Sequence, residues 1–446
     1  MVTNSLASWF LGEEARALLT RLARVKPFAL TETMVPAAGL SQAAQIAIER
    51  YLVEGRRELR RMVNNYIRWL NEPEGHNATP TEAQRRFTFL RMRFNVVLSQ
   101  FDLFADVLTQ RSEQDNGVWL SGLDVVAADA LEIPGGYYEA PPVVCYLDRG
   151  HGAAIRRART RLPGGGENPV AIIRVPRERM VGSGLASSLI HEVGHQGSVL
   201  LDLVDSIRPV LQGLQKGGSN EIVAWRLWQR WISEILADFW SVAKVGIAST
   251  LGLIGVVSLP RAFVFRVNLD DPHPIPWIRA KLSCAIGHAL YPHSQWDRLA
   301  SLWESFYPKT GLGEERQRLL EILESTMPGF IALLVNHHPK ALRGKSLIEV
   351  MSVAERQPAR LAAYYQMWRR SPREMRASSP SLAFAVIGQA RADGKISPEE
   401  ESKVLANLLK YWALNRTLNT SAVCATKPAV NVRQQSWLKS EYKLTA

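Results

Sequence analysis

The sequence has few cysteines and no long hydrophobic run. Its three cysteines, Cys145, Cys284 and Cys424, are odd in number and far apart, which excludes a disulfide framework or a Cys-x-x-Cys metal site and favours a reducing compartment. The most apolar segment, residues 245–259, is about 15 residues long, whereas a bilayer core requires about 20. We expect a buried helix there, with a membrane-associated segment as the alternative.

The amino terminus also lacks the features of a secretory signal. No basic residue precedes its short apolar stretch, and Glu13 and Glu14 follow that stretch directly. We therefore predict an amphipathic helix at this end and a cytoplasmic protein, with peripheral membrane association left open.

The charge balance is strongly basic, although the composition is that of an ordinary folded chain. The 446 residues are 46% hydrophobic, and 54 Lys+Arg against 42 Asp+Glu give a net charge of +12. Arginines cluster within residues 56–61, 85–93, 156–161 and 369–376, among acidic or apolar residues. No zinc ribbon, helix-turn-helix or RNA-binding strand accompanies them, so nucleic-acid binding is disfavoured. Solvated helix faces are the favoured interpretation, and an acidic partner or an anionic membrane surface is the alternative.

Hydrophobic periodicity predicts a mostly helical α+β fold. Apolar positions recur at helical spacing up to residue 112, with a break at residues 77–80. Short β-rich runs follow at residues 118–126, 141–147 and 168–175, and helical patterns return after residue 181, with a break at residues 217–220. We predict a helical N-terminal region (1–112), a central domain with a small sheet (113–340) and a helical C-terminal region (341–446).

Two histidines and a glutamate form the motif His191-Glu192-Val193-Gly194-His195 in one helical stretch. Histidines four positions apart lie on one helix face, within reach of one metal ion. Two neutral imidazoles suit Zn²⁺, and the Glu192 carboxylate can take a proton from a zinc-bound water without being a ligand. A chance occurrence of the motif is the alternative.

A catalytic zinc site of this kind requires a third protein ligand. A metzincin would have glycine and histidine where this chain has Ser198 and Leu201, so that solution is excluded. Glu234 and Asp238 instead lie four positions apart on one face of an apolar helical stretch, and Glu234 follows His195 by 39 positions. These two acids are the candidates to complete the site.

A buried acidic pair on such a helix needs a partner of opposite charge. The expected partners are a metal ion and a ligating imidazole. A buried salt bridge to a nearby arginine, Arg226 or Arg230, is the alternative.

A third motif is the run Asp-Pro-His-Pro-Ile-Pro-Trp-Ile-Arg at residues 271–279, and the three motifs together resemble the sequence motifs of a known family. They are similar to the HExxH, ExxAD and HPxxxxR elements of gluzincin zinc metallopeptidases, and in particular of the CAAX prenyl protease and bacterial heat-shock metalloprotease family. The resemblance covers about residues 165–285. It implies a zincin-like core with an HExxH active-site helix beside a small sheet.

The resemblance also implies a role for each matching residue. His191, His195 and Glu234 would be zinc ligands, Glu192 would be the general base, and Asp238 would accept a hydrogen bond from a ligating histidine. The chain departs from the family in lacking its four transmembrane helices and in having glycine at position 194, so membrane insertion is not implied.

The resemblance also implies roles for two further residues and one strand, and each role has an alternative. His273 would approach the metal or donate to the oxyanion, or else its His-Pro pair would cap the next helix. Arg279 would support the acidic pair or tie its loop to an acidic neighbour. The strand at residues 168–175 would be the edge strand that holds an extended substrate, or a plain core strand.

The C-terminal run around residues 384–412 resembles a tellurite-resistance-type helical module, in which an ADGxIS loop joins two helices. Read as a calcium loop, the run would place Gln389 and Arg391 at ligand positions, and both are poor calcium ligands. We prefer a joint between two helices in which Ser397 and Glu400 form a capping box.

The sequence as a whole predicts a zinc-dependent endopeptidase acting on a protein or peptide substrate. One alternative is a zincin-fold scaffold without catalytic activity. The other is a basic protein that binds a membrane surface or nucleic acid peripherally.

Overall fold

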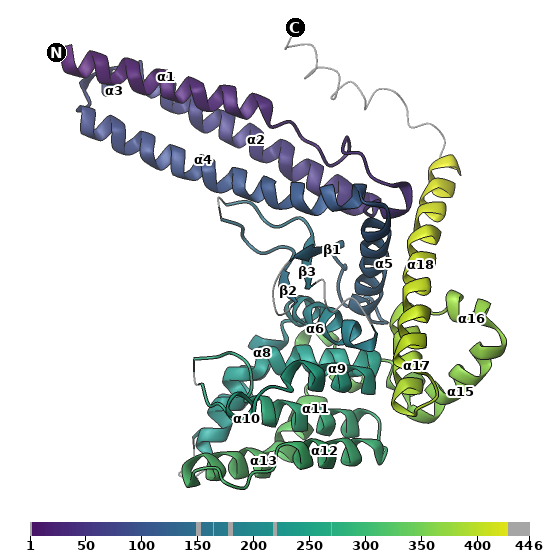
Figure 1. Ribbon diagram of the computed structural model, residues 1–446. Coiled ribbons are helices and arrows are strands. Elements are labelled where there is room, and N and C mark those ends of the chain that lie inside the picture. Colours follow the sequence, from purple (N-terminus) through teal and green to yellow (C-terminus); the bar gives the residue numbers. More distant parts are fainter. Residues whose placement is uncertain are drawn as a thin grey trace.

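The computed structural model describes residues 2–148, 153–163, 165–176, 182–216, 221–268 and 270–426. It is a mostly helical α+β chain with one three-stranded sheet, and this confirms the predicted fold class (Figure 1). The predicted break at residues 217–220 lies outside the described residues.

The N-terminal region forms an arm of long helices that extends from the body (Figure 1). Its elements are α1 (Val2–Arg24), η1 (Pro36–Ala38), α2 (Gln42–Leu70), α3 (Pro73–Asn77), α4 (Pro80–Thr109) and η2 (Gln110–Ser112). Helix α4 begins where the sequence predicted a break, because the Thr79 side chain accepts a hydrogen bond from the backbone N–H of Glu82 and proline occupies the first helical position. The helical prediction for the arm is thus confirmed.

The first predicted strand is wrong, because residues 118–126 lie within helix α5 (Gln114–Leu131). Burial covers most sides of α5, which packs against α18, α6, α17 and strand β1 (Val143–Asp148). A helix that is buried nearly all round carries no amphipathic stripe, so its short valine-rich run is easily mistaken for a buried strand.

The sheet lies between the arm and the body. Its other strands are β2 (Ala154–Arg156) and β3 (Ala171–Pro176), in the order β1-β3-β2, with β1 parallel and β2 antiparallel to β3. Alternate side chains point to opposite faces. Val144 and Ile172 join the hydrophobic core of the arm, whereas Cys145 and Ile173 join that of the body.

Strand β3 pairs on both sides and is therefore the central strand. The expectation that residues 168–175 form the edge strand is wrong, and the alternative of a plain core strand holds. Its apolar residues Ala171, Ile172 and Ile173 are all buried, which is typical of a strand covered on both faces.

The body is a set of packed helices, and a single hydrophobic core runs through it from residue 119 to residue 412. This core contains residues from both sides of residue 340, and the predicted domain boundaries stay predictions. Its helices are α6 (Ser183–Leu200), α7 (Leu203–Gly213), α8 (Ile222–Val245), α9 (Ile247–Val257), α10 (Arg261–Val264), α11 (Pro276–Leu290), α12 (Gln295–Phe306), α13 (Glu314–Val335), η4 (Lys340–Leu342), α14 (Leu347–Val350), η5 (Val353–Arg356), α15 (Pro358–Arg370), α16 (Pro372–Ala377), α17 (Pro380–Ala392) and α18 (Pro398–Thr426).

The apolar segment at residues 245–259 is the short helix α9, which packs against α6, α11 and α17. Gly246, at φ +57°, separates it from α8. Among the described residues, no helix is long and apolar enough to cross a bilayer.

The loop between α17 and α18 has the predicted capping box. The backbone N–H of Glu400 donates to the Ser397 hydroxyl, and the backbone N–H of Ser397 donates to the Glu400 carboxylate. The loop is therefore a joint between two helices, as preferred.

Helices α6 and α8 cross very closely because glycines lie at their contact. A Cβ atom added to Gly194 would lie 2.8 Å from the Cα of Ala237 and 2.8 Å from the Cβ of Trp240. A Cβ on Gly197 would lie 2.5 Å from the Trp240 ring. The glycine within the HExxH motif thus lets α8 approach the histidines.

We predict that Gly194→Ala destabilises the protein by about 1–3 kcal/mol, since the added methyl group meets the backbone of α8 rather than a movable side chain. Urea unfolding followed by circular dichroism would measure the change. Gly184→Ala is the matched control, because it lies on the same helix and its added methyl group meets no atom within 4 Å. Equal stability of the two variants would contradict the prediction.

Candidate metal centre

Helix α6 presents His191 and His195 on one face, as their spacing predicted. Their rings meet edge to face, with centroids 4.8 Å apart. The side chains are only 14% and 15% exposed. Each imidazole is therefore held by packing while part of its edge stays accessible.

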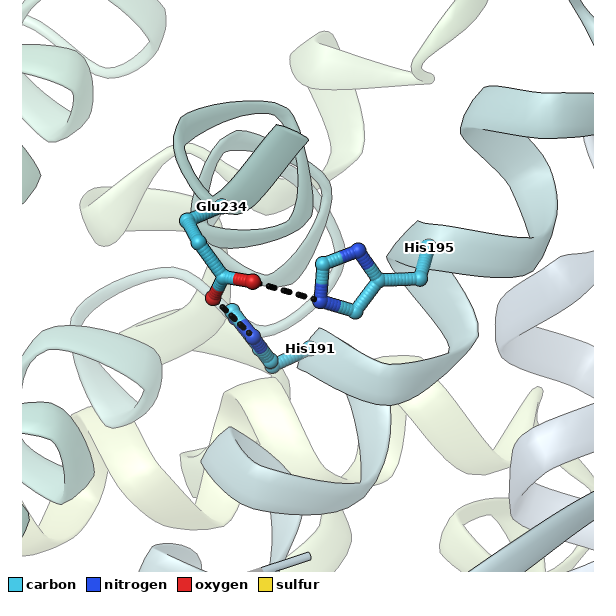
Figure 2. Close-up of side chains that lie close together, drawn as sticks. All are labelled: His191, His195 and Glu234. Atoms are coloured by element: carbon cyan, nitrogen blue, oxygen red, sulfur yellow. Dashed lines mark ion pairs between the residues drawn. The ribbon is translucent and has the colours of Figure 1, made fainter. Parts of the chain in front are cut away.

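Helix α8 brings the Glu234 carboxylate against both imidazoles (Figure 2). Its Oε2 atom lies 3.2 Å from His191 Nε2, and its Oε1 atom lies 3.4 Å from His195 Nε2. One ligand atom from each of the three side chains lies within 4.8 Å of the others. Within the part of the chain that the structure describes, no other group of three or more His, Cys, Asp or Glu converges in this way.

Asp238 fixes the orientation of His191. Its Oδ1 atom lies 2.8 Å from His191 Nδ1, so the other ring nitrogen, Nε2, faces Glu234. A carboxylate on one nitrogen of an imidazole sets the tautomer that leaves the second nitrogen free to bind a metal. The arrangement of Glu234 and Asp238 is thus the one that the motif predicted.

The arginine that neutralises the acidic pair is Arg279, on α11. Its Nε and Nη2 atoms donate to Asp238 at 2.7 and 2.9 Å, and Nη2 lies 3.5 Å from Glu234 Oε2. Arg226 and Arg230, the alternatives that the sequence offered, are both exposed. Both lie on the exposed side of α8. Arg279 contacts the acidic pair from α11, a helix that is distant in sequence.

The charges in this group favour a cation among its atoms. Burial raises the pKa of Glu234, but the adjacent imidazoles of His191 and His195 outweigh this effect and hold that pKa well below its ordinary value. Burial lowers the pKa of His191, but the adjacent Asp238 carboxylate outweighs this effect and raises it to about 9. Burial likewise raises the pKa of Asp238, which the Arg279 guanidinium lowers by more. The carboxylates thus stabilise positive charge here, either as an imidazolium or as a bound metal ion.

The buried oxygen Oε2 of Glu234 is suited to be a metal ligand. Glu234 Oε2 is buried and has no hydrogen-bond partner among the described residues, although two histidine nitrogens lie 3.2 Å from it and one Arg279 nitrogen lies 3.5 Å from it. A buried charged oxygen without a hydrogen bond is costly. Two imidazole nitrogens and one carboxylate oxygen form the donor set of a metal such as zinc, with a position left open.

Glu192 is 8% exposed and lies on α6 next to His191. Burial raises the pKa of Glu192 above its ordinary value, although the neighbouring histidines lower it in part. A carboxylate with a raised pKa is a better proton acceptor near neutral pH. The residue therefore has the environment of a general base.

His273 lies at the edge of the group and does not cap the next helix. Its Nε2 atom is 3.2 Å from Glu234 Oε2, and its Nδ1 atom is 2.7 Å from Asp271 Oδ1. Helix α11 begins after Ile275 and has no side-chain cap. His273 is 49% exposed, so its ring lies where a substrate can reach it.

Two contacts were missed by the sequence reasoning. The Ser233 hydroxyl lies 3.4 Å from His195 Nδ1, and Asp271 holds His273. The adjacency of Ser233 to Glu234 was the one signal for the first contact. The Asp-Pro-His order, with Asp271 two residues before His273, was the signal for the second.

The two edge strands of the sheet, β1 and β2, differ in their surroundings. On β1, the backbone N–H and C=O of Cys145 are bonded by the Asp124 and Arg111 side chains, and those of Leu147 are bonded by Gln110. Strand β2 lies at the other edge of the sheet and packs against α6. The Arg156 C=O at the end of β2 also accepts a hydrogen bond, from the Asn168 side chain, so both edge strands have backbone groups that are already bonded.

We predict that Asp238→Asn weakens zinc binding by about 10–100-fold, because the neutral amide holds His191 less firmly than the carboxylate. Titration against a chromophoric chelator would measure the dissociation constant. Asp271→Asn is the matched control, since it makes the same change beside His273, outside the group formed by His191, His195 and Glu234. Equal weakening in both variants would contradict the role given to Asp238.

Comparison of this chain with protein-family models, with curated proteins and with solved structures gives no match. The residues themselves therefore carry the functional argument. They form a His-His-Glu group that can hold a metal ion, in a mostly helical α+β chain.

Proposed function

We propose that this protein is a zinc-dependent metallopeptidase. The observation that carries the proposal is the convergence of His191, His195 and Glu234, with Asp238 behind His191 and the buried Glu192 beside it. Two imidazoles and one carboxylate with an open position are typical of catalytic zinc sites. The order of these residues along the chain, and their similarity to gluzincin motifs, supports a peptidase in particular.

The proposed chemistry assigns a separate task to each side chain. Zinc, when bound, supplies the Lewis acidity that polarises a peptide carbonyl and an attacking water. The Glu192 carboxylate accepts the proton of that water and delivers it to the nitrogen of the leaving amine. His273 donates from Nδ1 to Asp271 and, as an imidazolium with both ring nitrogens protonated, donates from Nε2 to the oxyanion that develops on the carbonyl oxygen.

The proposed substrate is an extended stretch of protein or peptide, paired with strand β2. The chain just after β2 is tied to the metal-site helix, because the backbone N–H of Ala158 donates to the Gln196 side chain at 2.8 Å. Gln196 directly follows His195. Backbone pairing along this edge tolerates many sequences and would hold a scissile bond beside the metal.

Metal analysis tests the site. We predict about one zinc per chain in the purified protein and a large loss in His195→Ala and Glu234→Ala, since each variant removes one of three protein ligands. Elemental analysis of the folded protein measures the content. His288→Ala is the control, because it removes a half-exposed histidine outside the group. Unchanged zinc in the two ligand variants would refute the site.

Activity tests the chemistry independently of metal binding. Glu192→Gln should keep the zinc and lower cleavage of denatured casein by about 10²–10⁴-fold, because an amide cannot accept the proton. Glu139→Gln makes the same change at an exposed position and should leave cleavage unchanged.

Failure of the activity test has a definite meaning. Zinc bound by His191, His195 and Glu234 without any cleavage that depends on Glu192 would contradict the peptidase proposal. It would favour a zinc-stabilised scaffold whose helical regions bind partners.

A further inference from the structure

The arm carries an exposed apolar groove between α2 and α4, with a volume of about 640 Å³. Tyr66 and Leu90 are buried in its floor. Phe89, Met92 and Val96 follow one another at helical spacing on α4 and are 65%, 58% and 37% exposed. An apolar stripe of this kind on a long surface helix is unusual in the absence of a partner.

Arginines surround this stripe. Arg86 and Arg93 line the groove itself. The Arg86 guanidinium is held over the Trp69 ring at 4.1 Å and pairs with Glu82 at 3.1 Å. Long arginine side chains beside exposed apolar groups can keep their charge at a polar boundary while the apolar groups enter an oily phase.

The positive charge continues from the groove onto the loop between β2 and β3. The Arg156 side chain donates to Gln100 on α4 at 3.1 Å, so the loop lies against the same helix. Gly165, near the other end of the loop, lies beside the Arg93 guanidinium. The end of β2 and the loop after it carry a cluster of exposed arginines, namely Arg156, Arg157, Arg159 and Arg161.

We propose that this arm face, formed by Met62, Phe89, Met92 and Val96 together with Arg86, Arg93 and the arginines of residues 156–161, docks on the surface of an anionic lipid bilayer. The inference is independent of the proposed peptidase activity. Helix α4 would lie along the bilayer surface, with its apolar stripe in the headgroup boundary and the arginines against phosphates.

The geometry favours a bilayer over an acidic protein helix. A docking helix would be held by the buried floor of the groove, whereas Phe89 and Met92 project from it and are more than half exposed. The arm is also long and extends from the body, so one side of it can lie on a surface (Figure 1). The chain's own residues 427–446 are an unfavourable occupant, because they are basic, with Lys427, Arg433, Lys439 and Lys443 against Glu441.

Co-sedimentation of the full chain with vesicles tests the proposal. The probe is unilamellar vesicles of roughly 70% phosphatidylcholine and 30% phosphatidylglycerol, compared with phosphatidylcholine alone. We expect binding to the anionic vesicles at low salt, at least about ten-fold tighter than to the neutral ones, and strong weakening at about 0.5 M salt. No binding to anionic vesicles at low salt would overturn the proposal and leave an acidic protein as the partner.

Variants locate the surface. Phe89→Ser with Met92→Ser, and separately Arg157→Gln with Arg161→Gln, should each weaken binding to anionic vesicles by about ten-fold or more. All these side chains are exposed, and unchanged circular dichroism would verify that each variant folds.

The matched control lies on the same arm, outside the arm face. Trp9→Ser with Phe10→Ser removes two aromatic rings of α1 that are 61% and 54% exposed. We expect this variant to bind as the wild type does. Equal loss in the control and in the Phe89/Met92 variant, or no loss in either face variant, would overturn the assignment.

Discussion

The packing of α8 against α6 places the buried carboxylates of Glu234 and Asp238 beside two histidines. Burying carboxylates is unfavourable unless positive charge and hydrogen bonds compensate them. Arg279 compensates Asp238 from a third helix, while Glu234 keeps one buried oxygen without a hydrogen bond. The crossing therefore favours positive charge beside Glu234, as an imidazolium or as a bound metal ion, and this links the candidate metal site to the packing of the body.

The His-His-Glu group was largely predictable from the sequence because its geometry is local. Four-residue spacing places two side chains on one helix face whatever the rest of the chain does. This rule applied twice, to His191 with His195 and to Glu234 with Asp238. Gly194 allows the close approach of α6 and α8, but in the sequence it was visible only as a departure from the family pattern.

Features that depend on contacts between distant segments could not be predicted in this way. Arg226 and Arg230 are nearest in sequence to the acids, yet Arg279 pairs with them, because helix packing rather than chain proximity selects the partner. The run at residues 118–126 reads as a strand, and only its surroundings show that it is a buried helix. The central place of β3 likewise depends on β2, whose three residues carry no clear β signal.

The segment from Ala154 to residue 161 joins two parts of the molecule with different chemistry. Its backbone forms the outer strand of the sheet and is tied to the metal-site helix through Gln196. Its side chains include exposed arginines, one of which contacts α4 of the arm. The net charge of +12 is therefore unevenly distributed, with acids enclosed among histidines at the candidate metal site and arginines gathered on the arm and this loop. Because backbone and side chains act separately in this segment, a surface that recognises its arginines need not compete with a peptide that pairs with its edge.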